Sequence, residues 1–111
     1  MDCVFCKISA GEIPSRKIYE DELCLAFYDV APAAPVHALV IPKEHIPSVL
    51  EAQDAGLLGH LLSVARDVAK LTGIDENGFR LVINTGEDGG QTVPHLHIHI
   101  LGGRSLAWPP G

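Results

Sequence analysis

The chain has little positive charge and no long apolar run, and both shortages limit what it can do. Lysine and arginine supply only 8 of its 111 residues against 14 aspartates and glutamates, so the formal net charge is −6. The basic residues form no cluster, which disfavours binding to a nucleic-acid backbone. A small anion can still bind, because backbone N–H groups hold phosphate without basic side chains. The apolar runs are too short to span a bilayer, so we expect no membrane association.

Cysteine is scarce as well, and the first residues show no recognisable export signal. Residues 1–3 lack a basic segment followed by an apolar run, so we expect a cytoplasmic protein. The three cysteines should then be thiols or metal ligands and not disulfides. Repeats and low-complexity segments are also missing, and the length fits a single domain over residues 1–111.

The pattern of apolar and turn-forming residues predicts more strands than helices. The main helix is expected over Ala55–Leu71, where Asp54 can cap the first turn, an apolar stripe follows at helical spacing, and Gly73 can end the helix. One short helical turn is expected over residues 3–9. The expected strands are Lys17–Glu20, Leu23–Tyr28, His37–Ile41, Phe79–Thr85 and His95–Leu101. Their short links favour an antiparallel sheet with the helix on one face, which is an α+β domain.

Residues 95–101 read His-Leu-His-Ile-His-Ile-Leu, so a histidine alternates with an apolar residue three times. Because successive side chains of a strand point to opposite faces, His95, His97 and His99 should share one face while the apolar residues enter the core. Each imidazole would need a hydrogen-bond partner if it were buried, so a functional role is favoured over packing. The row could be a metal site, or a nucleophilic histidine with two supporting histidines.

The loop before this strand helps to decide between the two chemistries. Residues 86–92 contain adjacent glycines, an amide and a hydroxyl, so backbone N–H groups can approach a phosphate closely there. Taken alone, the segment would be an ordinary hairpin loop. Next to three aligned histidines it favours a phosphate site. A catalytic metal centre is disfavoured, because no carboxylate accompanies the histidines at close spacing.

The histidine row resembles the signature of the histidine triad superfamily. Gly-Gly-Gln at 89–91 and Trp-Pro-Pro-Gly at 108–111 are similar to its histidine triad nucleotide-binding protein branch, of the zinc-carrying type. Further similar segments are Gly11–Pro14, Leu25–Val30, Pro35–His37, Val40–Lys43 and Gly102–Arg104. The resemblance implies a HIT-like fold, with a roughly five-stranded antiparallel sheet, one main helix and a short N-terminal helix. It also implies a homodimer whose sheets join, with the C-terminal tail near the partner's site.

The resemblance implies a hydrolase of purine nucleoside phosphoramidates, of the adenosine 5′-monophosphoramidase type, with a nucleotidyl-histidine intermediate. His97 would be the nucleophile, and His99 would donate to the phosphate oxygens. Asp29 would bind the ribose hydroxyls. Apart from the resemblance, the chemistry requires that the amine leaving group gain a proton, which Thr92 or the ligand's own phosphate could relay. The full nucleotide-binding set implied is Phe27, Tyr28, Asp29, Val30, Asn84, Gly90, Gln91, Thr92, His97 and His99. Thr92 stands where the family often has serine, which keeps the hydroxyl and adds a methyl group.

Two other functions stay open on the same scaffold. The protein could hydrolyse dinucleoside polyphosphates, or it could bind nucleotides without catalysis and act as an interaction surface. The presence of His97 and of the glycine-containing loop disfavours the non-catalytic alternative.

Residues 3–6 read Cys-Val-Phe-Cys, a Cys-x-x-Cys pair. A redox pair of this kind normally follows a strand in a thioredoxin-like unit, whereas this pair precedes every other predicted element. A tetrahedral zinc site needs two further soft ligands. The resemblance supplies His45 and His95, and so implies a structural zinc site of Cys3, Cys6, His45 and His95. The alternative is two free thiols, with His95 merely hydrogen-bonded.

Three further residues carry weaker expectations. Cys24 should be a small apolar filler in a strand, and His60 a partly exposed helical residue without a role. Trp108 lies in a proline-rich tail, where an exposed indole would be wasted. It either docks on its own domain or, as the resemblance implies, lines the leaving-group side of the neighbouring subunit's site.

Overall fold

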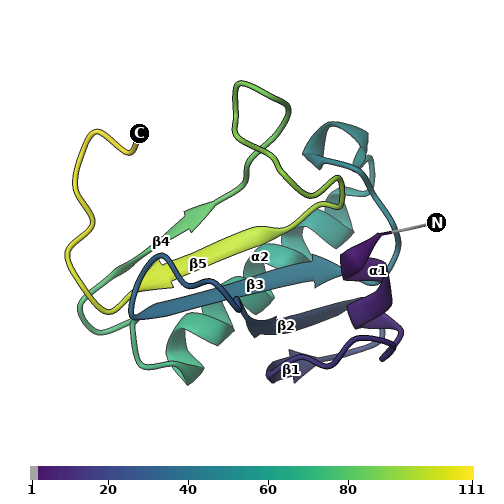
Figure 1. The fold of residues 1–111 in the computed structure, drawn as a ribbon. Coiled ribbons are helices and arrows are strands. Elements are labelled where there is room, and N and C mark those ends of the chain that lie inside the picture. Colours follow the sequence, from purple (N-terminus) through teal and green to yellow (C-terminus); the bar gives the residue numbers. More distant parts are fainter. Residues whose placement is uncertain (1–2) are drawn as a thin grey trace.

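The computed structural model describes residues 3–111. Their strands form a five-stranded antiparallel sheet in the order β1-β2-β3-β5-β4 (Figure 1). The strands are β1 Lys17–Glu20, β2 Cys24–Tyr28, β3 Val36–Pro42, β4 Phe79–Val82 and β5 Ile98–Gly102. The helices are α1 Val4–Ser9, the single 3-10 turn η1 Val49–Glu51, and α2 Ala55–Leu71. The predicted α+β fold, with one main helix and a short N-terminal helix, is therefore confirmed.

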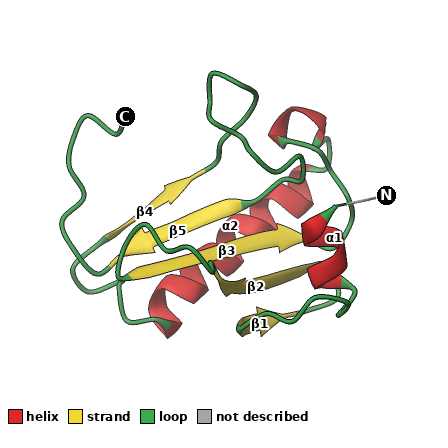
Figure 2. Cartoon of the chain, viewed as in Figure 1, coloured by secondary structure: helices red, strands yellow, loops and turns green. Residues whose placement is uncertain are grey.

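Helices lie on both faces of the sheet, and the alternation of the strands divides the core into two layers (Figure 2). The layer under α2 takes Cys24, Ala26, Ala38, Val40, Ile98 and Ile100 from the strands. The layer under α1 takes Leu25, Phe27, Leu39 and Ile41. On β5 the α2 side carries Ile98 and Ile100, and the other side carries His99 and the half-buried Leu101. The side of β5 that faces away from α2 therefore brings one of the three histidines of residues 95–99 into the sheet.

Helix α2 has the bounds that the sequence predicts, because its start and end signals are local. The Asp54 side chain caps the first turn by accepting the Leu57 N–H at 3.1 Å. Gly73 has a φ of 78°, a left-handed conformation that favours glycine after a helix. The buried apolar stripe of α2 packs against the sheet. No helix within residues 3–111 is long and apolar enough to cross a membrane.

The predicted strand His95–Leu101 is wrong at its start, since β5 begins only at Ile98. The Leu96 N–H bonds to the Ile46 carbonyl at 2.7 Å and the His95 N–H to that of Val93 at 2.8 Å. These bonds tie residues 95 and 96 to loop segments instead of to β3. Similarly, β4 ends at Val82 and not at Thr85. The other predicted elements match those observed to within one residue at each end.

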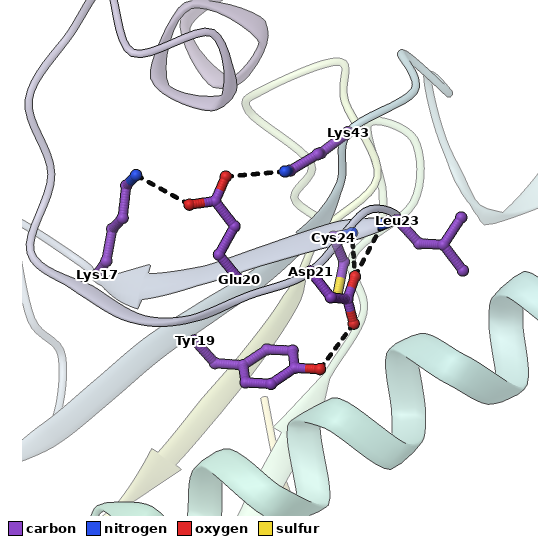
Figure 3. Close-up of polar contacts among 7 residues, drawn as sticks. All are labelled: Lys17, Tyr19, Glu20, Asp21, Leu23, Cys24 and Lys43. Carbon is purple, nitrogen blue, oxygen red and sulfur yellow. Dashed lines mark hydrogen bonds and ion pairs between the residues drawn. The ribbon is translucent and has the colours of Figure 1, made fainter.

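The turn between β1 and β2 is built around Asp21 (Figure 3). One carboxylate oxygen accepts the N–H groups of Leu23 and Cys24, and the other accepts the Tyr19 hydroxyl at 2.8 Å. His60 Nε2 from α2 lies 2.6 Å from that second oxygen. Desolvation alone would raise the pKa of Asp21, but these hydrogen bonds outweigh it and hold the pKa well below its ordinary value. His60 is partly exposed as predicted, yet it is no bystander, because it ties α2 to this turn.

Cys24 confirms its predicted role as an apolar filler. Its side chain is fully buried in the layer under α2. Burial, helped by the nearby Asp21 carboxylate, raises the pKa of the Cys24 thiol to about 12. The thiol therefore stays protonated near neutral pH.

Candidate active site and metal cluster

His97 has one ring nitrogen committed and one free for chemistry. Its Nδ1 lies 2.7 Å from the carbonyl oxygen of His95. A carbonyl can only accept, so Nδ1 carries the proton and Nε2 keeps its lone pair. The ring is buried, with Phe5 at 5.0 Å and His99 at 4.9 Å between ring centroids. The triad histidines therefore share one side of the chain as predicted, although only His99 lies in a regular strand.

A chain of hydrogen bonds fixes the tautomer of His99. The Ala33 N–H donates to His37 Nδ1 at 3.0 Å, so in the neutral ring the proton of His37 sits on Nε2. That Nε2 lies 2.9 Å from His99 Nδ1 and can donate to it. Burial lowers the pKa of His37, and burial with its neighbouring histidines lowers that of His99 to about 4. Both rings are thus neutral at pH 7, and His99 keeps a proton on Nε2.

His37 is a residue of the candidate site that the sequence analysis did not single out. The only signal was its place in the Pro-Val-His segment that resembles the family, and no role followed from it. Asp29 Oδ2 lies 3.4 Å from His37 Nε2, and the donor atoms of Asp29, His37 and His99 all lie within 4.8 Å of one another. A carboxylate therefore does accompany the histidines, contrary to the expectation from spacing. The nitrogens of His37 and His99 that face each other are already joined by a hydrogen bond.

The loop of residues 86–92 is shaped by two side-chain amides. Gln91 Oε1 accepts the Gly86 N–H at 3.1 Å, and Gln91 Nε2 donates to the carbonyl of Pro47 at 2.7 Å. Asn84 Nδ2 donates to the Gly89 carbonyl at 2.7 Å. A Cβ at position 89 would come within 2.3 Å of a backbone oxygen, so only glycine fits. The amides of Asn84 and Gln91 thus hold the loop closed on itself.

The four residues proposed for the base and the ribose lie around one pocket of about 320 Å³. Phe27 and Tyr28 come from the end of β2, and Asp29 and the almost fully exposed Val30 follow them. The opposite wall comes from α1. The volume is within the range of about 300–1,000 Å³ that small-molecule sites occupy, and the lining is mainly apolar. A planar base can be buried there.

The four predicted metal ligands meet in one cluster, with their ligand atoms within 4.8 Å of one another. Cys3 Sγ lies 3.3 Å from His95 Nδ1, and Cys6 Sγ lies 3.2 Å from His45 Nδ1. His95 Nε2 is 2.9 Å from the Pro42 carbonyl, so it carries the proton and leaves Nδ1 bare toward the sulfurs. Two sulfurs and two imidazole nitrogens suit a tetrahedral zinc ion. All three cysteines within residues 3–111 are free, as predicted.

An alternating row of histidines beside a glycine-containing loop, on a five-stranded antiparallel sheet, defines a histidine triad protein. The chain belongs to the HIT domain family, whose sequence profile matches residues 10–106. That match includes His45 and the triad, and it begins after Cys3 and Cys6.

Known proteins agree with this assignment along nearly the whole chain. An uncharacterized HIT-like protein of Synechococcus elongatus is 62% identical over 99% of this chain and 97% of its own length. The crystal structure of a HIT family hydrolase from Legionella pneumophila is 47% identical, with a TM-score of 0.96 over 99% of this chain and 100% of that one. A histidine triad nucleotide-binding protein from Candida albicans is 33% identical, with a TM-score of 0.85 over 97% of this chain and 83% of that one.

Proposed function

We propose that the protein hydrolyses purine nucleoside phosphoramidates, such as AMP joined to an amine, through a covalent nucleotidyl intermediate on His97. The observation that carries this proposal is the hydrogen bond from His97 Nδ1 to the His95 carbonyl, which leaves Nε2 as a bare nitrogen. A neutral imidazole is a good nucleophile near pH 7, and the N–P bond that it forms is readily hydrolysed. The name of the Legionella structure, a hydrolase, supports the reaction class.

In the first step His97 Nε2 attacks phosphorus, the N–P bond to the imidazole forms, and the P–N bond to the amine breaks. The amine leaves with a proton, which the Thr92 hydroxyl or the substrate's own phosphate can relay. In the second step water attacks phosphorus, AMP is released, and His97 is regenerated. The Nε2–H of His99 and the N–H groups of the loop donate to the phosphoryl oxygens, where charge develops.

The nucleotide would bind across the pocket and the loop. Phe27, Tyr28 and Val30 would enclose the purine, and the Asp29 carboxylate would accept from the ribose hydroxyls. The phosphate would lie next to Asn84 and the loop residues Gly90, Gln91 and Thr92, and it would face the rings of His97 and His99. The name of the Candida protein, nucleotide-binding, supports this assignment.

The remaining proposals concern metal, assembly and location. Zinc would be structural, on Cys3, Cys6, His45 and His95, because these four ligands leave no open position for substrate. A homodimer would form by joining sheets, since β4 is an edge strand and its Phe79 is 38% exposed. The protein would act in the cytoplasm on a small purine nucleotide, and neither nucleic acid nor membrane would be a partner.

The reaction can be tested by comparing substrates and trapping the intermediate. We expect adenosine 5′-phosphoramidate to be hydrolysed with a higher kcat/KM than diadenosine polyphosphates, with or without chelator. A His99 substitution should slow the second step, so rapid quench and intact-protein mass spectrometry should show AMP attached to His97. With chiral phosphorus, two displacements give net retention. Net inversion would mean direct attack by water and would contradict the covalent step.

The C-terminal tail should affect leaving-group specificity. Its indole does not dock on its own domain, because Trp108 is 80% exposed. Arg80 of β4 donates to the carbonyls of Leu106 and Ala107, which fixes the chain just before the indole. We expect Trp108→Ala to change kcat/KM unevenly across unsubstituted, alkyl and indole-bearing phosphoramidates, with the smallest effect on the unsubstituted one. Leu71→Ala, at an exposed apolar residue of α2, is the matched control. Equal changes for all three substrates would contradict contact with the leaving group.

A further inference from the structure

Helix α1 takes part in both the metal cluster and the base pocket. It has only six residues, which is too short for a helix to be stable by itself in water. Cys3 is its N-cap, with Sγ accepting the Cys6 N–H at 3.4 Å. The position of α1 therefore depends on what its side chains contact in the rest of the protein.

The two cysteines hold one side of α1 through the cluster. Their sulfurs lie 3.2–3.6 Å from the Nδ1 atoms of His45 and His95. In a thiol protein these contacts are weak hydrogen bonds between sulfur and nitrogen, whereas a bound zinc ion would replace them with a coordination bond to each of these four atoms. Metal binding would therefore attach α1 to the rest of the protein more strongly than the hydrogen bonds of its cysteines do.

The residues between and after these cysteines form a wall of the pocket. Val4, Phe5 and Ile8 all line the pocket of about 320 Å³. The Phe5 ring packs edge-on against Phe27 at 5.9 Å and against His97 at 5.0 Å between centroids. Any movement of α1 would thus change the pocket and the contact with the proposed nucleophile together.

We propose that metal binding at the Cys3, Cys6, His45 and His95 cluster and nucleotide binding in the pocket are linked through α1, so that each strengthens the other. The inference rests on the proposed function in taking a nucleotide as the ligand of the pocket. A wall that is already ordered costs less entropy to close on a base than one that must be ordered by the base itself. Because linkage is reciprocal, AMP must raise the affinity for zinc by the same factor by which zinc raises the affinity for AMP.

The test measures AMP binding by titration calorimetry on the full-length zinc-loaded protein and on its reduced, metal-free form. We expect the Kd of AMP to rise about tenfold when zinc is removed, within the usual range of coupling between sites. Competition with a chelator of known affinity should show zinc binding tightened by the same factor at saturating AMP. Phe5→Ala keeps all four ligands and removes the wall, so it should weaken AMP binding in both forms and abolish the coupling. Cys24→Ala removes a thiol outside the cluster and should keep the coupling.

Equal AMP affinities in the two forms, with both shown to be folded by NMR, would overturn the linkage and leave the proposed function standing. A zinc-loaded protein that does not bind AMP would overturn both. Where the metal-free form does not fold, the rate at which a chelator removes zinc from the loaded protein replaces the first measurement. Saturating AMP should slow this removal in the wild type and not in Phe5→Ala. Equal slowing in both would show that AMP acts by stabilising the whole fold, and would overturn the role of α1.

Discussion

Replacing His97 by alanine should abolish turnover while AMP still binds within a few-fold of the wild-type affinity. The variant lacks the nitrogen that would form the bond to phosphorus, and removal of a catalytic nucleophile commonly lowers kcat by about 10⁴- to 10⁶-fold. Binding should survive, because the pocket around Phe27 and Asp29 and the loop of residues 86–92 do not depend on that nitrogen. Steady-state kinetics and an AMP titration on the same preparation measure both quantities.

A second variant separates chemistry from the loss of a buried ring. His97→Asn retains a side-chain N–H that can donate to the His95 carbonyl, but its amide nitrogen is not a nucleophile. It should be as inactive as the alanine variant. His60→Ala removes a histidine from α2, where its bond is to Asp21, and should keep turnover per folded molecule. Turnover near the wild-type rate in both His97 variants would sink the assignment of the nucleophile.

Features with local signals could be predicted from the sequence. The sequence predicts α2 with the observed bounds, because Asp54 at its start and Gly73 at its end each act on the turn of helix next to them and the apolar stripe fills the length between. Cys3 and Cys6 form a local Cys-x-x-Cys motif, whereas His45 and His95 follow as ligands only from the family resemblance, and the four ligand atoms do meet within 4.8 Å. The apolar residues between the triad histidines enter the core under α2 as expected, because alternation continues through the irregular stretch before β5.

Features that depend on distant contacts could not be predicted. His37 bonds to His99 across 62 positions, and His60 contacts Asp21 across 39, so no local pattern reveals either pair. The start of β5 is set by the bond between Leu96 and Ile46, which follows from the path of another loop. The sequence places the Gln91 amide in the loop of residues 86–92. It does not reveal that this amide bonds to Gly86 within the loop and to the carbonyl of Pro47.

The double substitution Cys3→Ser and Cys6→Ser should lower stability strongly while leaving kcat per folded molecule appreciable. A ligand that binds only the folded state raises the free energy of unfolding by about 4 kcal/mol when its concentration is a thousand times its Kd. For a domain of this size that corresponds to a fall in Tm of about 15 °C. The activity should largely survive, because the protein supplies all four ligands of the proposed zinc site and the proposed nucleophile is not one of them. Because the proposed link through α1 is lost in the double variant, KM should rise by a larger factor than kcat falls.

The choice of serine isolates the metal from the helix cap. Cys3 is the N-cap of α1, and serine is among the best residues at that position, so the cap itself should not be lost. Cys24→Ala is the matched control for removal of a thiol, since it creates only a small cavity in the other core layer. Calorimetry or thermal scans with and without added zinc should show that zinc raises the Tm of the wild type and of the control, but not of the double variant. A zinc content below about a tenth of an equivalent in wild-type protein prepared with ample zinc would instead mean that the four residues hold each other by hydrogen bonds alone.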